Sequence, residues 1–134
     1  MVRQSLDKLC SSYYTVLMYS FGSYVRIRRE ALNADDKSMS VRQVAQRIGV
    51  EPAFLSKIER DVAPPPSEAK IVALAKELGE DPDLLLAMAG KVSSDLQEII
   101  RKRPQLIAEL LRQLKGQPDH AILYIVRQVS DGDW

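Results

Sequence analysis

The sequence is poor in residues that build disulfide-bonded or metal-bound scaffolds, since it holds one cysteine, Cys10, and one histidine, His120. A single cysteine cannot form a disulfide within the chain, and a zinc site would lack ligands. We therefore expect no metal and no cofactor. Cys10 is expected to be an inert small hydrophobe, and His120 a solvated or hydrogen-bonded side chain rather than a catalyst.

Long hydrophobic runs are also missing. The longest of them, such as Leu84–Ala89, are far too short to span a bilayer. The apolar stretch near Tyr13–Met18 is short and aromatic, which does not predict a signal peptide. These absences predict a soluble, cytoplasmic protein with no membrane partner.

Charge of neither sign dominates, since 19 lysines and arginines stand against 18 aspartates and glutamates. Residues 21–66 hold 8 basic and 6 acidic residues, whereas residues 67–134 hold 9 basic and 11 acidic ones. This mild asymmetry permits an anionic partner at the front of the chain without requiring one. The sequence has no nucleophile beside a base, no phosphate-binding loop and no paired carboxylates, so we do not expect an enzyme.

Signals for helix starts and stops are present throughout and strand signals are nearly absent, so the sequence predicts an all-α fold. Ser40 and Gln43 form a capping box, Gly49 is a typical helix stop, and Pro52 suits the first turn of a helix. Residues 21–90 are expected to form a five-helix domain, with helices at Phe21–Leu32, at Val41–Ile48, from Pro52, from the cap Ser67 to Leu78, and at Pro82–Ala89.

Two further segments flank this domain. Residues 1–20 are expected to form an N-terminal arm or an extra helix, and residues 91–134 a helical extension that forms a dimer. Within the extension we expect a second capping box at Ser94 and Gln97, a kink or a new helix at Pro104, and a last helix at Ala121–Val129.

The most informative stretch is Ser40–Arg60, which predicts a helix, a short turn and a second helix. Ala45 is small where the two helices must cross closely, and Gly49 permits the sharp turn. Leu55 and Ile58 anchor the second helix to the core. Such a pair leaves the N-terminal end of the second helix protruding, with a width that fits the major groove of DNA.

These positions form part of a longer signature, which comprises Ala45, Gly49 and Leu55–Arg60, then Pro66-Ser67 and the amphipathic Ile71–Leu78. The signature resembles that of the helix-turn-helix family of phage repressors and Cro, the XRE family, over roughly residues 21–90. The resemblance implies a Cro/repressor-like domain that binds double-stranded DNA. It also implies that Arg29 pairs with Glu59 at the end of the recognition helix. The base and phosphate contacts of the family fall at Pro52, Ala53, Phe54, Ser56, Lys57 and Arg60.

The recognition segment departs from the family in two places. Val41 stands where the family often has a glutamine that bonds a phosphate, so Arg42 or Gln43 would have to substitute for it. Pro52 and Ala53 stand where the family often has a polar reader. They offer no hydrogen bonds and could contact only thymine methyl groups.

The connections depart from the family as well. Asp61 replaces the expected glycine and must accept a left-handed conformation or reshape the turn. The loop Asp61–Ser67 has no lysine or arginine, so phosphate contacts there would need backbone N–H groups. The connection Asn33–Met39 is several residues longer than the family's usual tight turn.

Several of these residues also have a purely structural interpretation. Lys57 is the best candidate for a contact to guanine or phosphate, the alternative being a solvated lysine. Phe54 either contacts a sugar or a thymine methyl group, or belongs to the core. Ser56 is expected to make a polar contact to DNA rather than to pack in the core. Arg26 and Arg28 are expected to face either phosphate or solvent.

We therefore expect a sequence-specific DNA-binding transcriptional regulator, most simply a homodimeric repressor at a pseudo-palindromic operator. The alternative is an antitoxin or phage-type accessory protein whose C-terminal helices bind a protein partner, and a small-ligand sensor is a third class. The alternatives to a dimer through the extension are a monomer whose extension folds back on the DNA-binding domain, and a dimer formed by the N-terminal arm. The dimer is expected to form through apolar residues of the extension, namely Leu96, Ile99, Ile100, Ile107, Leu110, Leu111, Leu114, Ile122, Ile125 and Val126.

Overall fold

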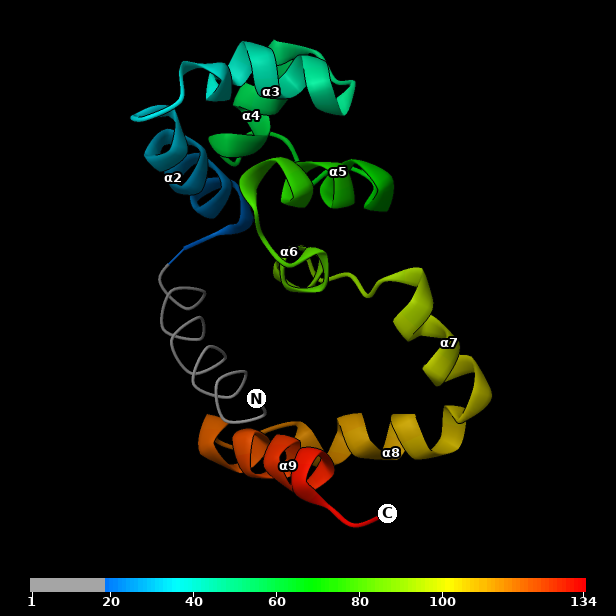
Figure 1. Cartoon of the computed structure of the whole chain (residues 1–134). Coiled ribbons are helices and arrows are strands. Elements are labelled where there is room, and N and C mark those ends of the chain that lie inside the picture. Colours follow the sequence, from blue (N-terminus) through cyan, green and yellow to red (C-terminus); the bar gives the residue numbers. More distant parts are fainter. Residues whose placement is uncertain (1–18) are drawn as a thin grey trace. The chain divides into compact units, whose positions relative to one another are not determined.

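The computed structural model describes residues 19–134, so Cys10 and nearly all of the expected N-terminal arm lie outside the described residues. This part of the chain contains eight α-helices, one short 3-10 helix and no strand. The predicted all-α fold is therefore confirmed. The described residues divide into two compact units, 19–93 and 94–134 (Figure 1). No helix of residues 19–134 is long and apolar enough to cross a membrane.

The first unit begins with α2 (Phe21–Asn33). The side chain of Ser20 caps this helix, because its Oγ accepts a hydrogen bond from the N–H of Ser23 at 3.2 Å. The long connection that follows contains the 3-10 helix η1 (Lys37–Met39), whose cap is Asp36. Met39 is buried in the core. The connection is long because it must bring this side chain back to the core.

The helix-turn-helix pair follows as α3 (Val41–Ile48) and α4 (Pro52–Glu59). Half of the predicted capping box is present, because Ser40 Oγ accepts from the N–H of Gln43 at 3.3 Å. Pro52 is the first residue of α4, where its missing N–H costs little. Both helices therefore begin at the residues that the sequence signals mark.

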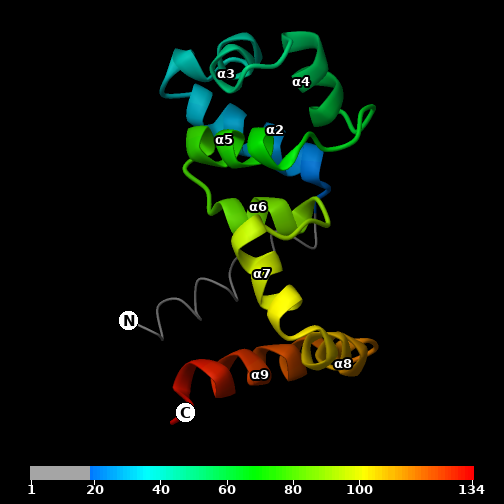
Figure 2. The same cartoon turned by 90° about the vertical axis from the view of Figure 1, so that its right-hand side faces the viewer.

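The first unit ends with α5 (Glu68–Leu78) and α6 (Pro82–Met88). Ser67 occupies the cap position of α5, but its side chain makes no capping hydrogen bond. In both views α3 and α4 lie at one end of the unit and α6 at the other (Figures 1 and 2). The core holds apolar side chains from all five helices and from η1: Phe21, Tyr24, Val25, Met39, Val44, Ala45, Ile48, Leu55, Ile58, Ile71, Leu74, Ala75, Leu78, Leu85 and Leu86.

The second unit contains α7 (Ser94–Lys102), α8 (Pro104–Leu114) and α9 (Asp119–Asp131). Ser94 is the first residue of α7. Pro104 begins a new helix instead of kinking a continuous one. No residue of these three helices is buried, so they close no core of their own.

Candidate nucleic-acid interface

The turn between α3 and α4 depends on a glycine and a distant lysine. Gly49 ends α3 with a φ of 77°, a left-handed conformation that is strained for residues with a side chain. The N–H of Val50 donates to the carbonyl of Ala45 at 2.9 Å and closes the turn. Lys70 Nζ donates to the carbonyl oxygens of Ile48 at 3.0 Å and of Gly49 at 3.2 Å. Lys70 thereby satisfies carbonyls that the end of α3 leaves free, and it holds the turn against α5.

Lys70 was not among the expected site residues. Its two acceptors lie 22 and 21 positions earlier in the sequence, so no local pattern marks it. A second contact links the same helices, because Arg47 Nε donates to Glu77 Oε2 at 2.8 Å. Helix α3 is thus tied to α5 at two points by residues that sequence reasoning did not select.

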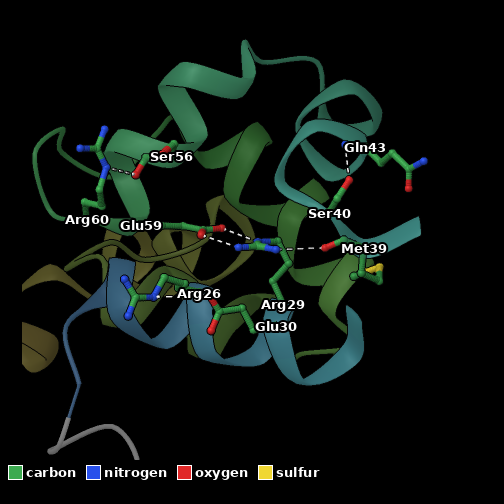
Figure 3. Close-up of polar contacts among 9 residues, drawn as sticks. All are labelled: Arg26, Arg29, Glu30, Met39, Ser40, Gln43, Ser56, Glu59 and Arg60. Carbon is green, nitrogen blue, oxygen red and sulfur yellow. Dashed lines mark hydrogen bonds and ion pairs between the residues drawn. The ribbon is translucent and has the colours of Figure 1, made fainter. Parts of the chain in front are cut away.

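The position of α4 relative to α2 depends on the buried pair of Arg29 and Glu59 (Figure 3). Arg29 Nε donates to Glu59 Oε2 at 2.8 Å and Nη2 donates to Oε1 at 2.9 Å. Nη1 of the same guanidinium donates to the carbonyl of Met39 at 3.2 Å. The hydrogen bond to Glu59 is the main reason that the pKa of Arg29 is raised. With both side chains buried, this planar bidentate contact joins α2, α4 and the connection before α3.

The outer face of α4 carries most of the residues that sequence reasoning selected. Pro52, Ala53, Phe54, Lys57 and Arg60 are exposed. Ser56 is half-buried, while Leu55, Ile58 and Glu59 are buried against the rest of the unit. Phe54 is 38% exposed, so its ring is available on the surface and does not belong to the core. The helix therefore presents one lysine, one aromatic ring and two small apolar residues to the outside.

The start of α3 carries the two residues expected to replace the missing glutamine. Arg42 is exposed and, within residues 19–134, has no intramolecular ion pair. Gln43 is engaged, because the amide orientation that satisfies its surroundings lets its nitrogen donate to the carbonyls of Lys37 and Ser38, both at 3.0 Å. Gln43 thus ties α3 to η1, which leaves Arg42 as the free donor at this helix start.

Asp61 adopts the left-handed conformation that its position requires, with a φ of 60°. Its carboxylate accepts a hydrogen bond from Ser20 Oγ at 2.7 Å, which joins the start of α2 to the end of α4. The two helices meet closely here, because a Cβ on Gly22 would lie 2.1 Å from the carbonyl oxygen of Ile58. A residue without a side chain is therefore required at Gly22.

The loop after α4 is less suited to bind phosphate than the sequence suggested. The N–H of Asp61 donates to Ile58, and the N–H groups of Val62 and Ala63 both donate to the carbonyl of Lys57, at 2.9 and 3.2 Å. The next three residues are prolines, which have no N–H. The six positions 61–66 therefore offer no free backbone N–H to a phosphate.

Arginines on α2 and α4 differ in their availability. Arg28 Nε lies 2.6 Å from Glu80 Oε1, although its N–H does not point at that oxygen. Tyr24 donates to the same oxygen at 2.9 Å, and burial followed by this hydrogen bond raises the pKa of Tyr24 to about 12. Arg26 lies 3.8 Å from Glu30, and Arg60 Nε donates to the carbonyl of Ser56 at 3.3 Å (Figure 3). Arg28 is thus held by the fold, whereas Arg26 and Arg60 remain at the surface.

A small-residue crossing, a left-handed glycine and a second helix with an exposed outer face define a protein of the helix-turn-helix class. Residues 20–88 match the family model described as a helix-turn-helix domain, which covers about half of the chain. The chain therefore belongs to this helix-turn-helix domain family, which is found in XRE-type regulators. Comparisons with curated proteins and with solved structures gave no match.

Membership of this family suggests a DNA-binding regulator and points away from an enzyme. No group of three or more His, Cys, Asp or Glu side chains that could hold a metal ion occurs in residues 19–134. The surface of α4 is accordingly the candidate site, with α3 as its support.

Proposed function

We propose that this protein is a sequence-specific DNA-binding transcriptional regulator that acts in the cytoplasm as a homodimeric repressor. The observation that carries the proposal is the exposed outer face of α4, whose side chains lie outside the buried core. Helix α4 would enter the major groove while α3 crosses the DNA backbone. Binding across a promoter would exclude RNA polymerase by occupancy, without a catalytic step.

Each exposed residue of this surface has a proposed role that follows from its chemistry. Lys57 contacts guanine or a phosphate, and Phe54 contacts a thymine methyl group or a sugar. Arg42 and Arg60 contact phosphates on either side of the groove. Pro52, Ala53 and the half-buried Ser56 line the same surface, and Gln43 supports it through its contact with η1.

Dimerisation is proposed to occur through the second unit. Its helices carry ten apolar residues at the expected dimer positions, of which none is buried. Exposed apolar surface on this scale is unfavourable in water unless a partner covers it. A second copy is the simplest partner, because a two-fold axis lets two identical domains bind a pseudo-palindromic operator.

The same exposed surface supports a second candidate function. In an antitoxin or a phage-type accessory protein, α7–α9 would bind a different protein and DNA binding would be secondary. The two candidates differ in what the purified chain does alone. A chain that is a stable dimer without any other protein supports the repressor, whereas one that becomes stable only with a partner supports the accessory protein.

Selection of binding sites from random double-stranded DNA tests the proposed function. The purified full-length chain should enrich a pseudo-palindrome whose half-sites lie about one helical turn apart, roughly 10 base pairs from centre to centre. A band-shift titration of the enriched duplex should then show specific binding. If no sequence is enriched over several rounds, the proposal of sequence-specific binding is wrong.

A further inference from the structure

Glu51 is an exposed carboxylate directly before the recognition helix, and the proposed function has no role for it. It occupies the cap position of α4 with an extended backbone, φ −69° and ψ 138°. Its side chain makes no capping hydrogen bond and no ion pair with any described residue. Capping is the common structural reason for a polar residue at this position, so its absence leaves the carboxylate free for an external partner.

The surroundings of Glu51 make it the main polar group at this end of α4. Pro52 and Ala53 follow it, are exposed, and have no side-chain donor or acceptor. Lys57 lies almost two turns further along the helix, too far to neutralise Glu51 through an i,i+4 pair. In the proposed orientation, the first residues of α4 are those that contact base edges.

The chemistry of a carboxylate restricts what it can contact there. An ionised glutamate only accepts hydrogen bonds, and phosphate groups repel it. In the major groove the exposed donors are the N4 amino group of cytosine and the N6 amino group of adenine. The adenine amino group lies beside the acceptor N7, which suits the mixed amide of asparagine or glutamine better than a carboxylate. Cytosine is therefore the base that matches Glu51.

We propose that Glu51 determines specificity by selecting a cytosine at one position in each half-site, where its carboxylate accepts from the N4 amino group. This inference rests on the proposed function, since it assumes that α4 lies in the major groove. Because Glu51 adds a negative charge to a surface that faces a polyanion, it also weakens binding to every sequence that lacks the matching cytosine.

Three full-length proteins test this proposal: the natural chain, Glu51→Gln, and Asp83→Asn as a control. Asp83 is exposed and lies in the first turn of α6. This helix is at the opposite end of the unit from α4 (Figure 1), and the replacement removes the same charge. Sites are selected from random DNA with each protein. The natural chain's best duplex is then titrated at fixed salt alongside duplexes in which each C·G pair is replaced by T·A.

We expect the natural chain to lose affinity by about 5- to 150-fold when one C·G pair per half-site is replaced, the usual range for one mismatched base pair. Glu51→Gln should lose this preference and should bind unrelated DNA more tightly, because a repulsive charge is gone. Asp83→Asn should behave as the natural chain does.

Other outcomes would contradict the proposal in distinguishable ways. If Glu51→Gln keeps the same base preference, Glu51 does not read cytosine, although DNA binding stands. If its affinity falls equally for all sequences, Glu51 has only a structural role at the start of α4. If the natural chain selects no sequence at all, the proposed function fails and this inference fails with it.

Discussion

Lys57 is the single residue whose removal should affect DNA binding most directly. It is exposed in the middle of α4. Lys57→Ala should weaken operator binding by about 1–3 kcal/mol if the side chain reads a base. If it contacts only phosphate, the loss should be uniform across sequences. Fluorescence anisotropy at fixed salt measures the affinity for the operator and for unrelated DNA, with Lys76→Ala on α5 as a matched control. An unchanged affinity in Lys57→Ala would exclude both roles for Lys57.

The Arg29–Glu59 pair should matter for stability as well as for binding. Removing one partner of a buried ion pair leaves an unpaired charge and costs about 3–5 kcal/mol. Glu59→Ala should therefore lower the free energy of unfolding of the first unit and weaken DNA binding. Denaturant unfolding followed by circular dichroism measures the change.

The control for this experiment is Glu30→Ala. Glu30 pairs with Arg26 at 3.8 Å, and both side chains are more than half exposed. An exposed pair contributes about 0–1 kcal/mol, so this variant should be nearly as stable as the natural chain. Equal losses in the two variants would argue against a special role of the buried pair.

Tyr24 should make the fold sensitive to alkaline pH. Its pKa is raised to about 12 in the folded chain, whereas an unfolded tyrosine titrates near its ordinary value of about 10. The folded state therefore holds this proton more tightly, so stability is lost as the pH rises from about 10 towards 12. Thermal melts across this range should show a shallower decline for Tyr24→Phe than for the natural chain. Identical declines would show that Tyr24 makes no contribution.

At the level of secondary-structure elements, the arrangement of α3 and α4 depends on α5. Lys70 bonds the last carbonyls of α3, and hydrogen bonds to charged groups contribute about 1.5–3 kcal/mol when well formed. Lys70→Met, which keeps the aliphatic length, should destabilise the first unit by up to this amount and weaken DNA binding. Urea unfolding and anisotropy measure the two effects, with Lys76→Met on the same helix as the control. If Lys70→Met keeps both the stability of the first unit and the affinity for DNA, the turn keeps its conformation without Lys70.

The elements were largely predictable from local residue types. Pro52 and Ser40 mark helix starts and Gly49 marks a helix end, because caps and left-handed positions depend on the residue itself. The contacts of Lys70 and the burial of Met39 were not predictable, since they depend on residues far away in the sequence. The hydrogen bonds of the loop after α4 were not predictable either. Its N–H groups donate to the carbonyls of Ile58 and Lys57 and are therefore not free to bind phosphate.

For the candidate site, sequence and structure contribute different information. The resemblance to phage repressors indicated which positions of α4 to consider, and the structure shows that most of them are exposed. It also separates Gln43, which bonds η1, from Arg42, which is free. That distinction requires the path of the longer connection, and no sequence pattern describes that path.

At the level of the whole molecule, the two units should behave differently when separated. Within residues 19–134, the buried apolar residues all lie between Phe21 and Leu86, so a chain that ends after Ser93 keeps every one of them. This truncated chain should stay folded, become monomeric and bind a full operator far more weakly than the intact protein. Analytical ultracentrifugation should report about twice the monomer mass for the intact chain at micromolar concentration.

Two results would contradict the prediction that the second unit forms the dimer. A truncated chain that still sediments as a dimer would place the dimer contact outside α7–α9. An intact chain that is monomeric yet binds a palindrome cooperatively would show that dimerisation occurs only on DNA. Circular dichroism of the truncated chain controls for loss of folding.

The loop after α4 bears on how strongly salt weakens DNA binding, because its three prolines have no N–H and its other N–H groups are already hydrogen-bonded. Residues 61–66 offer no free N–H to phosphate, so under the proposed function each copy would use side chains such as Arg42 and Arg60 to displace counterions from DNA. The logarithm of the affinity falls with that of the salt concentration by about 0.9 for each phosphate neutralised. For the proposed dimer, two such contacts in each copy give a slope of about 3.6, so a doubling of the salt concentration should lower the affinity about twelvefold. This salt dependence is weaker than it would be if the loop also bound phosphate.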